Sequence, residues 1–168
     1  MNKSSLHTFL SETGNIAAFP GRFFKEVFNP PYELAEFLKQ AYFIGYKSFP
    51  LVAITAFIMG LVITIQSRPT LVEFGAEAWL PKMVSVSLIR EIAPVITALI
   101  CAGKIGSGIG AELGSMKVTE QIDAMDVSGT NPFKYLVVTR VLATTLMIPV
   151  LVVMADAISL YGGYLGTN

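Results

Sequence analysis

Three long apolar stretches dominate the pattern of hydrophobic and polar positions along this chain. They cover residues 49–66, 83–103 and 141–165, and the first of them carries no charged residue. Each stretch is about the length of one membrane-spanning helix, which takes about 20 residues. The pattern predicts an all-α integral membrane helical bundle with three spans in this chain.

A shorter periodic segment precedes the first span. Apolar residues recur there at the i, i+3, i+4, i+7 spacing of one helix face, and charged residues occupy the opposite face. This pattern predicts an N-terminal helix in the membrane interface, within an interfacial region of about residues 16–47. A helix packed on the spans is the alternative interpretation. The apolar face comprises Leu34, Phe37, Leu38, Ala41 and Tyr42, and the polar face Glu33, Glu36, Lys39 and Gln40.

The composition agrees with a membrane protein and argues against other classes. Apolar residues make up 53% of the 168-residue chain and charged residues only 14%, whereas soluble proteins carry roughly 25% charged residues. The formal net charge is zero, and no basic stripe with interleaved aromatics indicates nucleic-acid binding. A lone cysteine, Cys101, and a lone histidine, His7, favour neither a disulfide framework nor a metal site.

The distribution of cations predicts the orientation in the membrane. Lysine and arginine are more frequent before the first span and between the second and third spans than between the first and second. The positive-inside rule therefore places the N-terminus and the second loop of this multi-pass protein in the cytoplasm. The cations on the predicted inner side are Lys3, Arg22, Lys25, Lys39, Lys47, Lys104, Lys117, Lys134 and Arg140.

Small residues follow one another at helical spacing at the end of the second span. The run GKIGSGIGAELG places Gly106, Gly110 and Gly114 four residues apart, with Ser107 and Ala111 as a second row. Such rows let helix backbones approach closely in lipid. The phosphate-binding GxxxxGK[ST] pattern is absent and no strand precedes the run, so we do not expect the chain to bind ATP itself.

The segment 112–126, ELGSMKVTEQIDAMD, is polar although it lies between two spans. Val118, Ile122 and Met125 form a narrow apolar stripe at helical spacing. A solvated connecting helix is the favoured interpretation on the pattern alone, because charged helix faces are usually just exposed. A helix that lies in a groove of a partner protein is the alternative.

Ionisable residues also occur inside the predicted spans, where they are costly and often functional. Arg90 and Glu91 lie early in the second span, near its outer side, and either serve a function or anchor the helix at the interface. Asp156 lies in the third span, either buried and paired or facing a wet cleft.

The sequence from residue 88 to residue 140 closely resembles the permeases of the MlaE family, the membrane subunits of ABC transporters that work with MCE-domain proteins. The family pattern is RE, a proline, AG followed by a basic residue and G, then AELG.MK.TEQI.A, a proline and a final basic residue. This chain matches it at Arg90, Glu91, Pro94, Ala102, Gly103, Lys104, Gly106, 111–114, Met116, Lys117, 119–122, Pro132 and Arg140.

The resemblance implies a role for each polar segment. Residues 112–126 would be the cytoplasmic coupling helix, docked on a separate ATPase subunit that binds ATP and Mg²⁺. Its polar contacts would come from Glu112, Lys117, Glu120, Gln121 and Asp123, with Ile122 and Met125 filling the groove. A phospholipid pocket at a homodimer interface would be lined by Ile63, Leu71, Phe74, Glu91 and Ile92, with Arg90 next to them.

The resemblance implies a single non-catalytic permease domain over residues 1–168, with an MCE-domain protein as its partner on the outer side. It implies a location in the bacterial inner membrane and no cofactor bound directly to this chain. Family members usually have five spans, so this chain would be C-terminally incomplete relative to them. A membrane scaffold that recruits a cytoplasmic partner without transport is the second interpretation.

Overall fold

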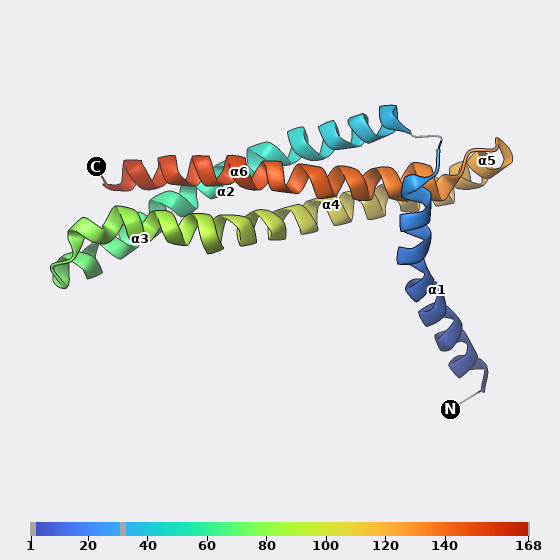
Figure 1. The fold of residues 1–168 in the computed structure, drawn as a ribbon, viewed down its shortest axis with the longest axis horizontal. Helices are drawn as coiled ribbons and strands as arrows, with labels where there is room; N and C mark the ends of the chain where they lie inside the picture. The colour runs from blue at the N-terminus through green and yellow to red at the C-terminus, as the bar shows by residue number, and fades with distance from the viewer. Residues whose placement is uncertain (1–2, 31–32, 168) are drawn as a thin grey trace.

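The computed structural model describes residues 3–30 and 33–167, and all regular elements in these ranges are helices (Figure 1). The all-α prediction is confirmed. The elements are α1 (Lys3–Phe28), α2 (Leu34–Glu73), η1 (Glu77–Trp79), α3 (Leu80–Ser87), η2 (Leu88–Ile92), α4 (Ala93–Val118), α5 (Gln121–Val127), η3 (Phe133–Val138) and α6 (Thr139–Thr167).

Three of the continuous helical stretches are long and apolar enough to cross a membrane. They cover Leu34–Glu73, Glu77–Val118 and Phe133–Thr167, and each contains one of the predicted spans. The stretches measure 40, 42 and 35 residues, well above the roughly 20 residues that a bilayer requires. The helices therefore extend beyond the apolar layer at one or both ends.

The α2 and α6 helices form the most extensive interface of the bundle, and two glycines make it possible. A Cβ added at Gly60 would lie 2.0 Å from the carbonyl oxygen of Ser159, and one at Gly162 would lie 2.5 Å from that of Phe57. Any side chain at either position would push the two backbones apart. This contact is the close helix packing that small residues allow in lipid.

The main buried cluster lies where α2, α4 and α6 meet. Ile44 and Val52 of α2, Cys101 of α4 and Ala143 and Ala155 of α6 are buried there. Cys101 is fully buried as a free thiol. It serves as a small packing residue between the helices.

The N-terminal region differs from the predicted interfacial region of residues 16–47. The structure divides this region between α1, which runs crosswise to the bundle (Figure 1), and the first turns of α2. Residues 34–48 are continuous with the first span, and Gln40, Ile44 and Ser48 are buried in the bundle. Helix α1 contacts η3, where the rings of Phe19 and Phe133 meet edge to face at 5.3 Å.

The small-residue rows of α4 are packed less closely than the glycines of α2 and α6. Outside its own helix, no described atom lies within 4 Å of a Cβ added at Gly106, Gly110 or Gly114. Ser107 and Ala111 are also exposed. Both rows therefore lie on a part of α4 that the described residues leave uncovered.

Candidate functional site

Three of the six residues predicted for the lipid pocket come together at one end of the bundle. Ile63 and Leu71 of α2 and Ile92 of η2 are half-buried and pack against the buried residues Leu80, Val84 and Leu88. Leu88 is fully buried at the centre of this cluster. The cluster joins α2 to the first turns of the second spanning stretch.

The other three predicted residues lie at the same end but are exposed. Phe74 is 78% exposed where α2 ends. Arg90 and Glu91 are exposed on η2, and neither forms an ion pair with a described residue. The six residues thus form an apolar group facing the bundle and an exposed group with one aromatic and two charged side chains.

Arg90 and Glu91 lie in a π-helical turn, Leu88–Ile92, and Pro94 explains this turn. Proline has no N–H to donate to the carbonyl four residues back, and its ring displaces that carbonyl. The N–H of Ala93 donates to the carbonyl of Leu88, five residues back. Single π-helical turns inside α-helices are frequent at functional sites, and this one carries both ionisable residues of the span.

A cavity of about 450 Å³ lies beside the Leu80–Leu88 cluster, between α3, α2 and α6. Val84 and Leu88 form one wall, Thr64 contributes from α2, and Gly163 and Tyr164 contribute from α6. Sequence reasoning missed these five lining residues. Apart from Thr64, none of them interrupts the apolar pattern of the predicted spans. The Thr64 hydroxyl donates to the carbonyl of Gly60 at 2.9 Å.

Asp156 is half-buried in α6, and its Oδ1 has no hydrogen-bond partner in the described part of the chain. Of the two interpretations left open by the sequence, the structure therefore gives no support to a paired carboxylate.

At the opposite end of the bundle, the predicted coupling segment is divided into two helices. Residues 112–118 are the last turns of α4, and α5 begins only at Gln121. Glu120 lies between them in the left-handed conformation, with φ 57° and ψ 17°. This conformation costs a residue with a Cβ about 1 to 2 kcal/mol, and it turns the chain into α5.

Helix α5 lies at the far end of the bundle, beyond α4 (Figure 1). Lys117 of α4 forms an ion pair with Asp123 of α5 at 3.0 Å, which bridges the turn. Ile122 and Met125 are half-buried, whereas Glu120, Gln121 and Asp123 are exposed. The break moves Val118 out of the predicted stripe, and its side chain is 85% exposed.

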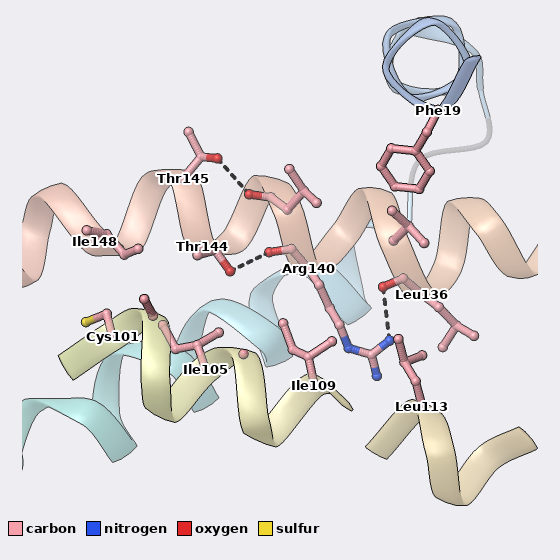
Figure 2. A pocket seen from close by; sticks show the side chains of 14 residues that line it. Phe19, Cys101, Ile105, Ile109, Leu113, Leu136, Arg140, Thr144, Thr145 and Ile148 are labelled. Carbon is pink, nitrogen blue, oxygen red and sulfur yellow. Dashed lines mark hydrogen bonds between the residues drawn. The ribbon is translucent and has the colours of Figure 1, made fainter. Parts of the chain in front are cut away.

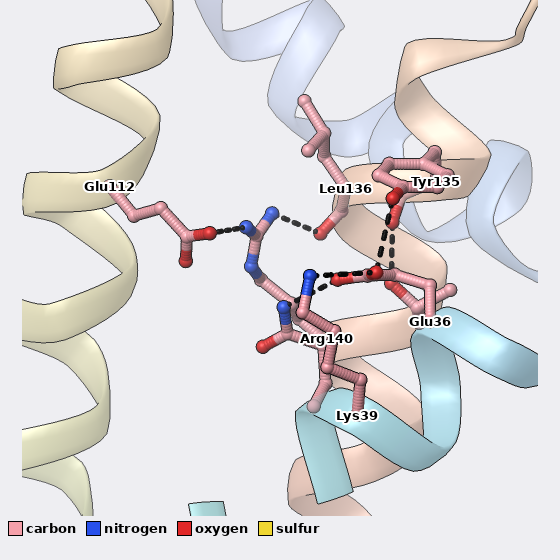
Figure 3. A network of polar contacts seen from close by, with 8 residues as sticks. Glu36, Lys39, Glu112, Tyr135, Leu136 and Arg140 are labelled. Carbon is pink, nitrogen blue, oxygen red and sulfur yellow. Dashed lines mark hydrogen bonds and ion pairs between the residues drawn. The ribbon is translucent and has the colours of Figure 1, made fainter. Parts of the chain in front are cut away.

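Glu112, the remaining predicted coupling residue, pairs within the chain. Arg140 of α6 donates from Nη2 to Oε1 of Glu112 at 2.9 Å, and from Nη1 to the carbonyl of Leu136 at 3.0 Å (Figure 3). The Arg140 side chain is only 4% exposed, whereas that of Glu112 is 49% exposed. The pair joins α4 to α6 just before the chain enters α5.

A second polar group lies next to this ion pair. The Tyr135 hydroxyl donates to Glu36 at 3.0 Å, and the Gln40 amide donates to the same carboxylate at 2.8 Å (Figure 3). Lys39 lies 3.5 Å from Glu36. These contacts join the first turns of α2 to η3, so α2, α4 and α6 are all connected by polar contacts at this end.

An apolar cavity of about 550 Å³ lies between α4 and α6 at the same level (Figure 2). Ala102 and Gly106 of α4 contribute little volume there, and Thr144 and Ile148 line the α6 side. Phe19 of α1 and Arg140 of α6 lie toward one end of the cavity, and Cys101 and Ile148 lie toward the other. Sequence reasoning missed this cavity, because it read the small residues of α4 as a close packing surface.

Comparison with known proteins identifies the family of the chain. Residues 37–168 match the Permease MlaE family. The chain is 41% identical over 157 residues to a probable ABC transporter permease protein of Rickettsia typhi, a match that covers 94% of this chain. It is 39% identical over 150 residues, 88% of this chain, to a probable ABC transporter permease protein of a Synechocystis strain.

A further relative has a more specific name. The chain is 35% identical over 128 residues, 76% of its length, to the intermembrane phospholipid transport system permease protein MlaE of Haemophilus influenzae. The matches span 61%, 57% and 49% of the Rickettsia, Synechocystis and Haemophilus proteins, so the chain corresponds to about half to three fifths of their length. Given the family match over residues 37–168, together with its three long apolar helices, this chain belongs to the MlaE permease family.

Proposed function

We propose that this chain acts as a membrane-spanning permease subunit of an ABC transporter that moves phospholipids between membranes. The observation that carries the proposal is its membership of the MlaE permease family, in which the Haemophilus influenzae relative is named as a phospholipid transport permease. In this proposal the chain catalyses no reaction. A separate ATPase subunit hydrolyses ATP and drives the movement.

The position and surface of α5 support its role as the contact with the ATPase. A permease must transmit the movement of a cytoplasmic subunit to its spans, which requires a protruding element joined firmly to one of them. Helix α5 lies beyond the bundle (Figure 1), and the Lys117–Asp123 ion pair ties it to α4. Ile122 and Met125 would supply the apolar contact with the ATPase and Glu120 and Gln121 the polar contacts.

The distribution of charge supports the orientation. Arg22, Lys47, Lys104 and Lys117 lie toward the end of the bundle that carries α5, whereas Arg68 and Lys82 lie toward the other end. By the positive-inside rule, the α5 end faces the cytoplasm of a bacterial inner-membrane protein. An MCE-domain partner would then meet the end that carries η2, and a second copy of the protein would complete the permease.

Copurification tests the ATPase contact. The chain is produced in membranes together with the ATPase subunit encoded beside its gene, as wild type, as Ile122→Asp and as the matched control Ile122→Leu. We expect wild type and Ile122→Leu to retain the ATPase and Ile122→Asp to lose it, because a carboxylate cannot be buried in an apolar groove without a partner. Equal recovery with all three forms would refute the assignment of α5.

Bound lipid tests the substrate and separates transport from a scaffold role. Phospholipid that copurifies with the chain is quantified for wild type, for Phe74→Ala and Glu91→Gln, and for the control Glu77→Gln. Glu77 lies at the same end and is also exposed, but it pairs with Arg68 at 3.4 Å. Loss of lipid with the first two variants alone supports a lipid site at η2. Retention of the ATPase with lipid unaffected by either variant would favour the scaffold.

A further inference from the structure

A small pocket with two lysines lies between α2 and α4, away from the predicted lipid residues. Its volume is about 200 Å³. Phe43 and Ile44 of α2 and Ile105 and Ile109 of α4 form apolar walls. Lys47 and Lys104, one from each helix, also line it.

Both ammonium groups contact the same short stretch of α2, residues 43–47. Lys104 donates from Nζ to the carbonyl oxygen of Lys47, which uses one of its three N–H donors. The Nζ of Lys47 lies 3.9 Å from the centre of the Phe43 ring. Among the described residues, neither lysine forms an ion pair with a carboxylate.

The one carboxylate that lines the pocket is already neutralised. Glu112 is paired with Arg140 at 2.9 Å (Figure 3). Gln40, which also lines the pocket, donates its amide to Glu36. The lysines therefore leave the pocket with an uncompensated positive charge next to apolar walls.

The pocket also lies at the level of a lipid headgroup. Lys47 lies two residues before the uncharged run 49–66 in α2, and Lys104 directly follows the apolar run 83–103 at the other wall. Both lysines thus mark the edge of the apolar layer. In the orientation proposed above, this edge belongs to the cytoplasmic leaflet, where basic pockets between spanning helices bind anionic headgroups.

We infer that this pocket binds the headgroup of an anionic glycerophospholipid from the cytoplasmic leaflet, with the phosphate between Lys47 and Lys104. A phosphate accepts charge-assisted hydrogen bonds from both ammonium groups, and Phe43 and Ile109 contact the start of the acyl chains. The site lies at the opposite end of the bundle from η2 and its predicted lipid residues. Its sidedness rests on the proposed orientation, but its binding of lipid does not depend on transport.

Native mass spectrometry of the purified chain in a neutral detergent tests the site. Phosphatidylglycerol and phosphatidylcholine with identical acyl chains are added in turn to wild type, Lys47→Gln, Lys104→Gln and Lys104→Arg. Lys82→Gln is the control, because Lys82 lies at the other end of the bundle over the Trp79 ring. The ATPase and ATP are absent, so this result and the copurification result can fail independently.

We expect wild type to retain phosphatidylglycerol in preference to phosphatidylcholine. Each lysine near an anionic lipid contributes about 1 kcal/mol, so Lys47→Gln and Lys104→Gln should each weaken phosphatidylglycerol binding about fivefold. Lys104→Arg and Lys82→Gln should leave it unchanged. Should Lys104→Gln fail to fold, the exposed position 47 decides the test alone.

Three outcomes would overturn the inference. Equal retention of the two lipids by wild type would remove the headgroup preference. An undiminished preference in Lys47→Gln would place the bound lipid elsewhere on the chain. Displacement of the lipid by added inorganic phosphate would identify a site for free anions instead of a lipid.

Discussion

Arg140 of α6 and Glu112 of α4 are joined by an ion pair of 2.9 Å in which the arginine is almost fully buried and the glutamate is half-exposed. The guanidinium has a second partner in the Leu136 carbonyl, while its Nε has no partner among the described residues. The arginine thus depends on Glu112 for the compensation of its charge.

Removal of Glu112 should therefore destabilise the bundle. Glu112→Ala leaves a buried donor without a partner, which costs about 1 to 3 kcal/mol. Thermal unfolding of the detergent-solubilised chain should show a lower midpoint for this variant. Glu73→Ala, at an exposed position where α2 ends, is the control and should not shift the midpoint. Replacement of both partners, Glu112→Ala with Arg140→Met, should recover much of the loss; a double variant less stable than Glu112→Ala would contradict this account.

Alanine substitutions should have opposite effects at two glycines. Gly60→Ala places a Cβ 2.0 Å from the Ser159 carbonyl oxygen, so α2 and α6 must separate and the unfolding midpoint should fall by several degrees. Gly106→Ala meets no described atom outside its own helix within 4 Å, and alanine favours the helix by about 1 kcal/mol over glycine. Its midpoint should stay equal or rise. A fall of the same size in both variants would show that the close α2–α6 contact is not decisive.

The left-handed residue at the start of α5 predicts a stabilising substitution. Glycine adopts a positive φ without the steric cost that Glu120 carries at φ 57°. The greater entropy of glycine in the unfolded chain offsets part of this gain, which leaves about 0.5 kcal/mol, so Glu120→Gly should slow amide hydrogen exchange in α5 about twofold. Asp126→Gly, inside α5, should accelerate the exchange because glycine weakens a helix interior. Faster exchange in both variants would argue against the positive φ at residue 120.

Pro94 should control the direction in which Glu91 points. Pro94→Ala restores an N–H that can donate to the Arg90 carbonyl, so the π turn should convert into an ordinary α turn. A π turn holds one residue more than an α turn, so its conversion into an α turn rotates the preceding helix by about 100°. Labelling of a cysteine placed at position 91 by a water-soluble thiol reagent should slow in the Pro94→Ala background. Cys101 is buried and gives little background. Identical labelling rates in both backgrounds would show that the proline does not set the turn.

Sequence patterns predicted the spans because the local composition of a long apolar run is enough to identify a membrane-spanning helix. The three stretches of Leu34–Glu73, Glu77–Val118 and Phe133–Thr167 each contain a predicted span. The continuity of α2 across residues 47–49 was missed because an amphipathic pattern and an apolar pattern are both helical, and composition does not show whether the helix bends between them. Pro50 lies inside α2 without ending it.

The candidate site was less predictable because it depends on distant partners. The sequence does not show that Glu112 of α4 and Arg140 of α6, which are 28 residues apart, form an ion pair between the two helices. The break between α4 and α5 at Glu120 was not predicted because no glycine or proline lies near it in the sequence. The family resemblance named Arg90 and Glu91, but only the structure shows the π turn that places them outside the apolar cluster.

The contrast between the tight α2–α6 contact and the uncovered side of α4 has a mechanical consequence. Gly60 and Gly162 lock α2 and α6 together as one stiff pair, whereas α4 ends in α5 and leaves its small-residue rows free of packed neighbours among the described residues. In the proposed function, a movement of the ATPase at α5 would therefore reach α4 first, and α4 would move relative to the α2–α6 pair. At its other end, α4 is continuous with the π turn that carries Arg90 and Glu91.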